Sequence, residues 1–290
     1  MAARVRTTNA AGLKKKVHRT IDAAGTGRHS ASLAPWSAPE YFVPNILVAD
    51  DNPVSLRFFA EALTQLGVSS ELAHDGLETV AKAERARFDV LLLDARMPGL
   101  DGAGALARIR NGSGPSRDAI AIATTAEAGD RARRELTEAG FVDVVAKPVT
   151  LVALRKALAP HLAGSIEGDD ASAEVADDAL DDVRALSAVG GDVSILSALR
   201  GLFVAELDAL PAEIADIGAR ADVVALRDRL HRLDASAGFC GAPALVRACA
   251  KVRLAVDQGA SWPDAAIAEF LDACADVRAK LVNSGASPAR

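Results

Sequence analysis

Five short apolar runs alternate with five longer stretches of helical periodicity between residues 46 and 161, and this alternation restricts the possible folds strongly. The apolar runs span 46–49, 70–73, 88–93, 119–123 and 142–146. The helical stretches follow at about 53–66, 76–87, 101–110, 128–139 and 149–161. A repeated strand and helix forms a parallel sheet with helices on both faces. We therefore predict a doubly wound α/β domain over residues 44–163.

Polar residues follow four of the predicted strands. Asp50 and Asp51 follow the first run, Asp94 the third, Thr125 the fourth and Lys147 the fifth. In the flavodoxin-like strand order that we expect, the carboxyl ends of all strands lie along one edge, so these side chains should meet. Three neighbouring carboxylates favour a cation, and an all-oxygen site suits Mg²⁺. Asp94 would then stay ionised and could attack phosphorus, with Lys147 and Thr125 contacting the transferred group.

An alternative is that the three aspartates only cap helices, as Asp after a strand often does. Asn52 and Pro53 form a good cap and first-turn pair by themselves. At least one acidic residue there is therefore not needed for capping, and the spacing of the set favours a site.

Four stretches of the chain resemble the signature stretches of a response-regulator receiver domain: VADDN (48–52), LLLDARMPGLDG (91–102), ATTA (123–126) and AKP (146–148). The resemblance implies that Asp94 is the phosphoacceptor. It also implies that Asp51 and Asp94 bind Mg²⁺ directly, that Asp50 binds it through water, and that the backbone carbonyl of Arg96 completes the protein ligands.

Three residues near this predicted site depart from the family pattern or extend it. Val144 stands where receivers usually carry an aromatic switch residue, which predicts a different output mechanism. Arg96 and Glu127 lie two positions beyond Asp94 and Thr125, at the predicted entrance of the site. We expect that the two pair, or that Arg96 touches the phosphate, and that they thereby set how fast water reaches an acyl phosphate. Ordinary solvated charges are the alternative.

Beyond residue 163 the composition changes. Residues 164–176 are small and acidic without an apolar period, which predicts a flexible linker. Residues 177–284 show helical periodicity and no strand pattern, and we expect an all-α four-helix bundle there, with a disordered tail over 285–290. Breaks that contain Gly or Pro divide this region at 190–191, 218–222, 238–243 and 259–263.

The stretch 223–238 carries a histidine off its apolar face. At about 100° per residue, Leu226, Leu230, Leu233 and Ala237 fall within a narrow arc and should be buried. His231 falls on another side, among Arg227, Asp228, Asp234, Ala235 and Gly238. A core histidine is therefore not expected. The small residues beside it favour a reactive, outward-facing imidazole that another protein approaches, and an unremarkable surface histidine is the alternative.

The stretch HRLDASAGFCGAPAL (231–245) resembles the signature of histidine phosphotransfer domains, and the resemblance implies that His231 is a phosphoacceptor. Three positions depart from that family. Asp234 replaces its usual Lys, Ala235 replaces the usual Gly next to it, and Arg253 replaces its usual Gln or Glu. Asp234 would repel a phosphoryl group one helical step away. Arg253 could offset this effect by pairing with Asp234 or by contacting the phosphate.

The first 43 residues are expected to form a basic disordered arm. Between 1 and 40, seven Lys or Arg residues face two acidic ones, a charge of +5, so the remainder carries −11 of the total of −6. An acidic surface, nucleic acid or lipid could bind such an arm, and a merely solvated tail is the alternative. Three cysteines without a CxxC pair predict buried thiols in a reducing cytoplasm. No stretch is apolar enough to span a membrane.

Together these features predict a cytoplasmic phosphorelay protein of a two-component system. It has no GxxxxGK[ST] loop, so a sensor histidine kinase would supply phosphate to Asp94, and His231 would exchange it with a receiver domain, either its own or that of a downstream response regulator. Whether the chain counts as an enzyme stays open. One rival is a receiver with a degenerate docking module that acts as a scaffold or phosphate sink. An aspartate-nucleophile phosphatase fits less well, because Arg96 occupies the place of its general acid. Nucleic-acid binding is not expected, because residues 177–290 are acidic.

Overall fold

The computed structural model describes residues 44–127, 129–161, 180–258 and 262–285. The predicted arm and the predicted linker lie outside these residues, as does all but the first residue of the predicted tail. From residue 44 onward, the described residues belong to a single compact unit.

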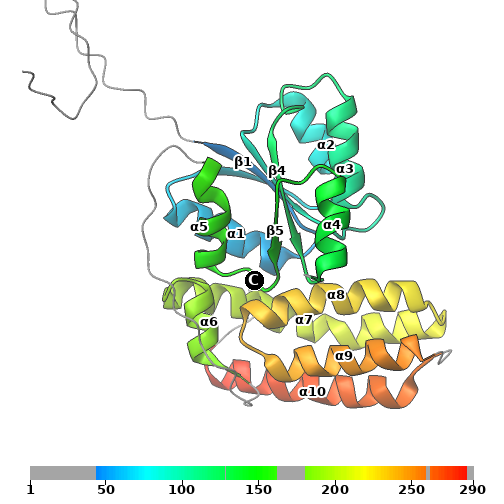
Figure 1. The fold of residues 1–290 in the computed structure, drawn as a ribbon. Helices are drawn as coiled ribbons and strands as arrows, with labels where there is room; N and C mark the ends of the chain where they lie inside the picture. Colours follow the sequence, from blue (N-terminus) through cyan, green and yellow to red (C-terminus); the bar gives the residue numbers. More distant parts are fainter. Residues whose placement is uncertain (1–43, 128, 162–179, 259–261, 286–290) are drawn as a thin grey trace, which may run out of the picture. The chain divides into compact units, whose positions relative to one another are not determined.

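The first region is a five-stranded, entirely parallel sheet with the order β2-β1-β3-β4-β5, as predicted (Figure 1). Its strands are β1 (Asn45–Ala49), β2 (Ser69–Ala73), β3 (Val90–Asp94), β4 (Ile120–Thr125) and β5 (Asp143–Ala146). Its helices are α1 (Pro53–Gln65), α2 (Gly76–Arg85), α3 (Gly102–Asn111), α4 (Asp130–Glu138) and α5 (Leu151–Leu158), followed by a short 3-10 turn, η1 (Ala159–His161).

Alternate residues of the central strands face two different cores, which explains why these strands are apolar throughout. On β3, Val90 and Leu92 belong to the core that includes α1 and α5. Leu91 and Leu93 belong to the core that includes α2 and α3. The strands are therefore fixed from both faces, and the loops at their carboxyl ends start from rigid positions.

The second region is helical, as predicted. It consists of α6 (Asp182–Ala188), α7 (Val193–Ala219), α8 (Val223–Phe239), α9 (Pro243–Asp257) and α10 (Asp264–Asn283), and the four long helices lie side by side (Figure 1). The predicted breaks separate these helices. The stripe of Leu226, Leu230, Leu233 and Ala237 is buried in the bundle, which confirms the helical-wheel prediction.

The core beneath α1 continues into the bundle. Phe58 of α1 stacks on Phe239 of α8, with ring centroids 4.4 Å apart and planes inclined by 29°. Both rings are almost completely buried, and the same apolar cluster extends through α7. This contact brings the amino end of α1, which follows the loop after β1, close to α8.

Candidate functional site

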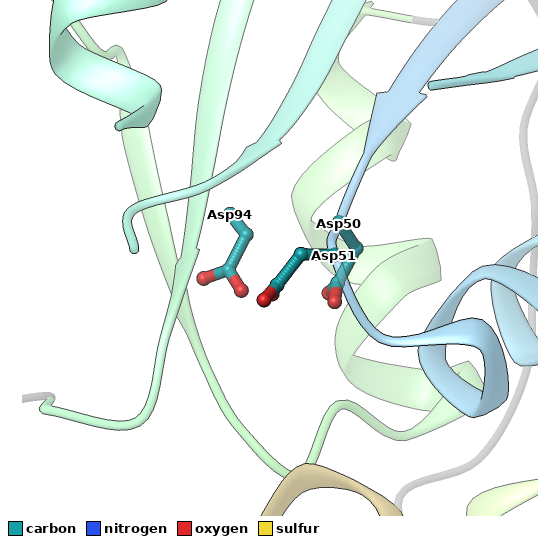
Figure 2. A group of neighbouring side chains, drawn as sticks. All are labelled: Asp50, Asp51 and Asp94. Carbon is teal, nitrogen blue, oxygen red and sulfur yellow. The ribbon is translucent and has the colours of Figure 1, made fainter. Parts of the chain in front are cut away.

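Three carboxylates converge at the carboxyl edge of the sheet, as predicted. Asp50 and Asp51 follow β1, and Asp94 ends the neighbouring strand β3 (Figure 2). One oxygen of each lies within 4.8 Å of the others. Asp50 and Asp94 are fully buried, and the Asp51 side chain is 9% exposed. Asp50 and Asp51 lie in the loop between β1 and α1. Asn52, the next residue, caps α1 and so fixes the end of this loop.

Lys147 brings a positive charge from the end of β5 to this cluster. Its Nζ lies 2.8 Å from Asp50 Oδ2 and 2.6 Å from Asp94 Oδ2. Burial alone would lower the pKa of Lys147, but the two carboxylates outweigh that effect and raise it. The lysine is therefore held in its charged form between them, as a group that neutralises charge at Asp94.

One lysine does not neutralise three carboxylates. Burial, together with the charge of Asp94, raises the pKa of Asp50 to about 6 although Lys147 opposes the shift. Burial and the two neighbouring aspartates raise the pKa of Asp51 to about 7. Burial also raises the pKa of Asp94. In addition, Asp51 Oδ1 is buried without a hydrogen-bond partner. An unsatisfied buried carboxylate oxygen in an anionic cluster fits a bound cation.

Arg96 and Glu127 flank the cluster and pair with each other at 2.6 Å, which is one of the two predicted arrangements. The backbone N–H of Arg96 also donates to Asp94 Oδ1 at 3.3 Å. Thr125 is buried at the end of β4, and its hydroxyl accepts a hydrogen bond from the N–H of Glu127 at 3.1 Å. Val144, at the position of the aromatic switch, is buried as well.

His231 of α8 faces these carboxylates. Its Nε2 lies 4.0 Å from Asp94 Oδ2, and its side chain is 15% exposed. The ring lies off the leucine stripe, as the helical wheel predicted, yet it is not as accessible as we expected, because the α/β region covers it. Burial lowers the pKa of His231 to about 4, and the positive charges of Lys147 and Arg96 contribute. Its Nε2 is buried without a hydrogen-bond partner.

The departure at Asp234 is compensated within the bundle. Arg253 of α9 forms an ion pair with Asp234, which confirms one of the two expected roles of this arginine. The Asp234 side chain is 13% exposed and that of Arg253 is 32% exposed. Burial raises the pKa of Asp234, and Arg253 opposes the shift. Asp234, one helical step from His231, therefore has its negative charge balanced by Arg253.

Contacts that join the α/β region to α8 beside the carboxylates and His231 were not predicted from the sequence. The amide of Asn52 donates to the carbonyl of Arg232 and to the hydroxyl of Ser236. The guanidinium of Arg232 lies 3.6 Å from Asp51. Each contact joins two residues about 180 positions apart, and neither residue carries a motif that indicates its partner. Only Asn52 had a sequence signal, and that signal was helix capping.

Comparison with known proteins gives two family matches. The model of the response regulator receiver domain matches residues 46–159, and that of the Hpt domain matches residues 198–280. The chain therefore contains a receiver domain followed by a histidine phosphotransfer (Hpt) domain. These are the two phosphoacceptor modules of two-component signalling, and together they define a phosphorelay protein.

Curated relatives are sensor kinases. The chain is 27% identical over 233 residues to the sensor protein GacS of Pseudomonas syringae pv. syringae, and 26% identical over 240 residues to the signal transduction histidine-protein kinase BarA of Shigella flexneri. The alignments cover 77% and 80% of this chain but only 26% of each relative. The chain thus spans about a quarter of the length of these relatives.

Among solved structures, the receiver domain of sensor histidine kinase PA1611 from Pseudomonas aeruginosa PAO1, with a magnesium ion coordinated in its active site cleft, is 36% identical. The match covers 41% of this chain and 98% of that one, with a TM-score of 0.39. In the part of the chain that the structure describes, no helix combines the length and the hydrophobicity needed to cross a bilayer.

Proposed function

We propose that Asp94 accepts a phosphoryl group from a sensor histidine kinase and that His231 exchanges phosphoryl groups with a receiver domain. The observation that supports this proposal best is the 4.0 Å separation of His231 Nε2 from Asp94 Oδ2. This separation is too long for a hydrogen bond, and it leaves room for one phosphorus atom between the nitrogen and the oxygen, bonded to one or the other. Two candidate phosphoacceptors thus face each other at the distance that a transfer between them requires.

Asp94 is suited to act as the nucleophile. Its carboxylate attacks the phosphorus of a donor phosphohistidine, a P–O bond forms, and the P–N bond of the donor breaks with its electron pair returning to the donor imidazole. Lys147 Nζ, 2.6 Å from Asp94 Oδ2, is placed to neutralise charge on the oxygens of the transferred group. The Thr125 hydroxyl, at the end of the adjacent strand, would donate a hydrogen bond to the same group.

The acidic cluster fits Mg²⁺, because Asp51 Oδ1 is buried and unpartnered and all three candidate ligands are oxygens. Asp51 and Asp94 would hold the ion directly, Asp50 would hold it through water, and the carbonyl of Arg96 would add a further ligand. When bound, Mg²⁺ supplies positive charge to the carboxylates and to the phosphoryl oxygens.

His231 would then take over the phosphoryl group. With the ring proton on Nδ1, the lone pair of Nε2 attacks phosphorus, the P–N bond forms, and the P–O bond to Asp94 breaks with its electron pair returning to the carboxylate. The absence of a hydrogen-bond partner leaves Nε2 available for this step. Both linkages are high in energy, so transfer can run in either direction and positioning sets its rate.

Charged neighbours would adjust this chemistry. The Arg96–Glu127 pair lies beside Asp94 and would control how fast water reaches the acyl phosphate. The Asp234–Arg253 pair would limit repulsion of a phosphate on His231. The partners that we propose are a sensor histidine kinase and the receiver domain of a downstream response regulator. Neither partner requires a nucleic-acid contact.

Residue-specific mapping of phosphate tests the proposal. The full chain is incubated with Mg²⁺ and a labelled phosphorylated receiver, or with acetyl phosphate. We expect a base-labile acyl phosphate at Asp94 and an acid-labile, base-stable label at His231. Asp94→Asn should remove the first and His231→Gln the second. Asp101→Asn, which keeps the exposed cap of α3, and His74→Gln, which changes an exposed histidine, are matched controls that should retain both labels.

The outcomes separate the candidate functions. An acyl phosphate at Asp94 without any label at His231 under either donor would reject a relay and favour a docking module that serves as a scaffold or phosphate sink. Absence of label at Asp94 in the wild-type chain would reject the receiver half of the proposal.

A further inference from the structure

Every polar atom of the Asn52 side chain is used, and the two ends of its amide serve different domains. Oδ1 accepts hydrogen bonds from Val54 N at 2.7 Å and Ser55 N at 3.2 Å, which caps α1 of the receiver. Nδ2 donates to the Arg232 carbonyl at 2.6 Å and to Ser236 Oγ at 2.8 Å, both on α8 of the Hpt domain. The side chain is buried, so each of these bonds replaces a contact with water.

The Hpt domain fixes which group Ser236 presents to Asn52. Ser236 Oγ donates its proton to Glu206 Oε2 at 2.5 Å. Glu206 is held in turn by Arg229, at 2.8 Å, and the Arg229 side chain is only 4% exposed. Because the hydroxyl proton points to Glu206, Ser236 can only accept the hydrogen bond that it forms with residue 52. The α8 surface therefore presents two acceptors, a carbonyl and a hydroxyl oxygen, to a group with two N–H donors.

We propose that Asn52 is a positioning residue that recognises α8 and makes the chain's own receiver domain the preferred partner of His231. This inference rests on the proposed function and names the partner within it. Asn52 directly follows Asp51 of the acidic cluster, and Arg232 directly follows His231. A contact between these neighbours sets the separation of the two phosphoacceptors. A receiver with a hydroxyl or carboxylate at this position could not make both donations, so the contact also discriminates between receivers.

A second contact supports the same pairing by shape. A Cβ built on Gly238 would lie 2.8 Å from Pro148 Cβ. Pro148, the receiver residue after Lys147, therefore approaches α8 more closely than a residue with a side chain at position 238 would permit. Two of the receiver's contacts with α8 are thus selective, one for hydrogen-bond donors at position 52 and one for the absence of a side chain at position 238.

Asn52→Asp in the full chain separates recognition from capping. Aspartate keeps an acceptor for the α1 cap, because Asp and Asn cap helices equally well. It removes both N–H donors and sets a negative oxygen against the Arg232 carbonyl. Asn111→Asp makes the same charge change at an exposed position of α3 and is the matched control. Ser236→Ala, on the Hpt side, removes one acceptor and is the second variant.

Docking and transfer are measured separately. Spin labels at Arg131→Cys and Lys251→Cys, both highly exposed positions, report the distance between the two domains, because the three natural cysteines are buried and do not react. Acetyl phosphate loads Asp94, and the rate at which base-stable label then appears on His231 reports transfer within the chain. The acyl phosphate formed at Asp94 shows that the receiver is intact.

We expect Asn52→Asp to lengthen and broaden the distance distribution and to slow labelling of His231 by about tenfold or more, since an unpaired buried acceptor remains. Ser236→Ala should act in the same direction more weakly, and Asn111→Asp should match the wild type. An unchanged distance and transfer rate in Asn52→Asp would overturn the inference and leave the proposed function intact. A wild-type chain that never labels His231 would reject the proposed function, while the distance measurement would still decide the role of Asn52.

Discussion

The receiver and the Hpt domain bring charged groups to the same place by different means. The receiver collects Asp50, Asp94 and Lys147 from three strand ends and buries all of them. The Hpt domain places His231 and Asp234 on a single helix and pairs Asp234 with an arginine of the next helix. The first arrangement is held by the sheet and has excess negative charge. The second is balanced by pairs that still reach water, and it depends on the receiver for its burial.

This difference teaches which interactions are costly to disturb. A charge buried among charges has no water to replace a lost partner, whereas a partly exposed ion pair does. Substitutions in the receiver site should therefore change stability strongly. Those around His231 should change transfer chemistry more than stability.

The largest effect is expected for Lys147→Met. Without the ammonium group, Asp50 and Asp94 would be buried beside each other with no counter-cation, and the free energy of unfolding should fall by about 3–5 kcal/mol. Urea denaturation without Mg²⁺ measures it. Lys251→Met is the matched control: its ion pair with Glu269 is 69% exposed on both sides, and its loss should cost less than about 1 kcal/mol. Equal effects of the two substitutions would remove the contrast between the domains.

The next largest effect should come from the metal. At a Mg²⁺ concentration about 100 times the dissociation constant, binding to the folded state should add about 2.7 kcal/mol to the stability of the wild-type chain. Asp51→Asn removes the carboxylate with the unpartnered oxygen and should lose most of this gain. Thermal unfolding with and without Mg²⁺, with Ca²⁺ as a test of selectivity, provides the measurement. If Asp51→Asn gains as much as the wild type, Asp51 is not a ligand.

The contrast between the domains also explains what could be predicted from the sequence. Apolar runs of strand length and the rule that parallel strands end at one edge were enough to bring Asp50, Asp51, Asp94 and Lys147 together. Boundaries were less exact where local hydrogen bonds decide them. The third strand begins at Val90 rather than Phe88, because the Phe88 N–H donates to the Ser116 hydroxyl instead of to a neighbouring strand.

In the Hpt domain, periodicity identified the side of α8 on which His231 lies but not its burial. Burial here is caused by the receiver, and no local pattern encodes that contact. The same holds for Asn52, whose capping role is visible in the sequence while its bonds to Arg232 and Ser236 are not. Gly238 was expected to give another protein room, and the structure shows that a residue of the same chain, Pro148, uses that room.

A smaller effect is expected for Gly238→Ala, because this substitution changes the free energy of unfolding in two opposite ways. Alanine favours the helix by about 0.8–1 kcal/mol, but its methyl group would clash with Pro148, and overpacking costs about 1–3 kcal/mol. We expect a net loss of about 1 kcal/mol and a longer distance between spin labels on the two domains. Gly129→Ala, where a Cβ meets no atom within 4 Å, should leave that distance unchanged. A stabilised Gly238→Ala chain with an unchanged distance would show that the close approach to Pro148 does not limit docking.

The smallest change in stability is expected for Arg253→Ala, below about 1 kcal/mol, because the arginine is 32% exposed. Its effect on chemistry should be larger in proportion. Without the guanidinium, Asp234 faces a phosphoryl group on His231 one helical step away, and the phosphohistidine should decay about two- to fivefold faster, equivalent to about 0.5–1 kcal/mol of repulsion. The decay rate of base-stable label after removal of the donor measures this. Asp234→Asn in the same chain should restore the lifetime, whereas Arg227→Ala, which breaks another pair between α8 and α9, the exposed one with Asp257, should not alter it. Equal lifetimes in all four chains would mean that the Asp234–Arg253 pair only holds α8 against α9 and has no part in stabilising the phosphorylated histidine.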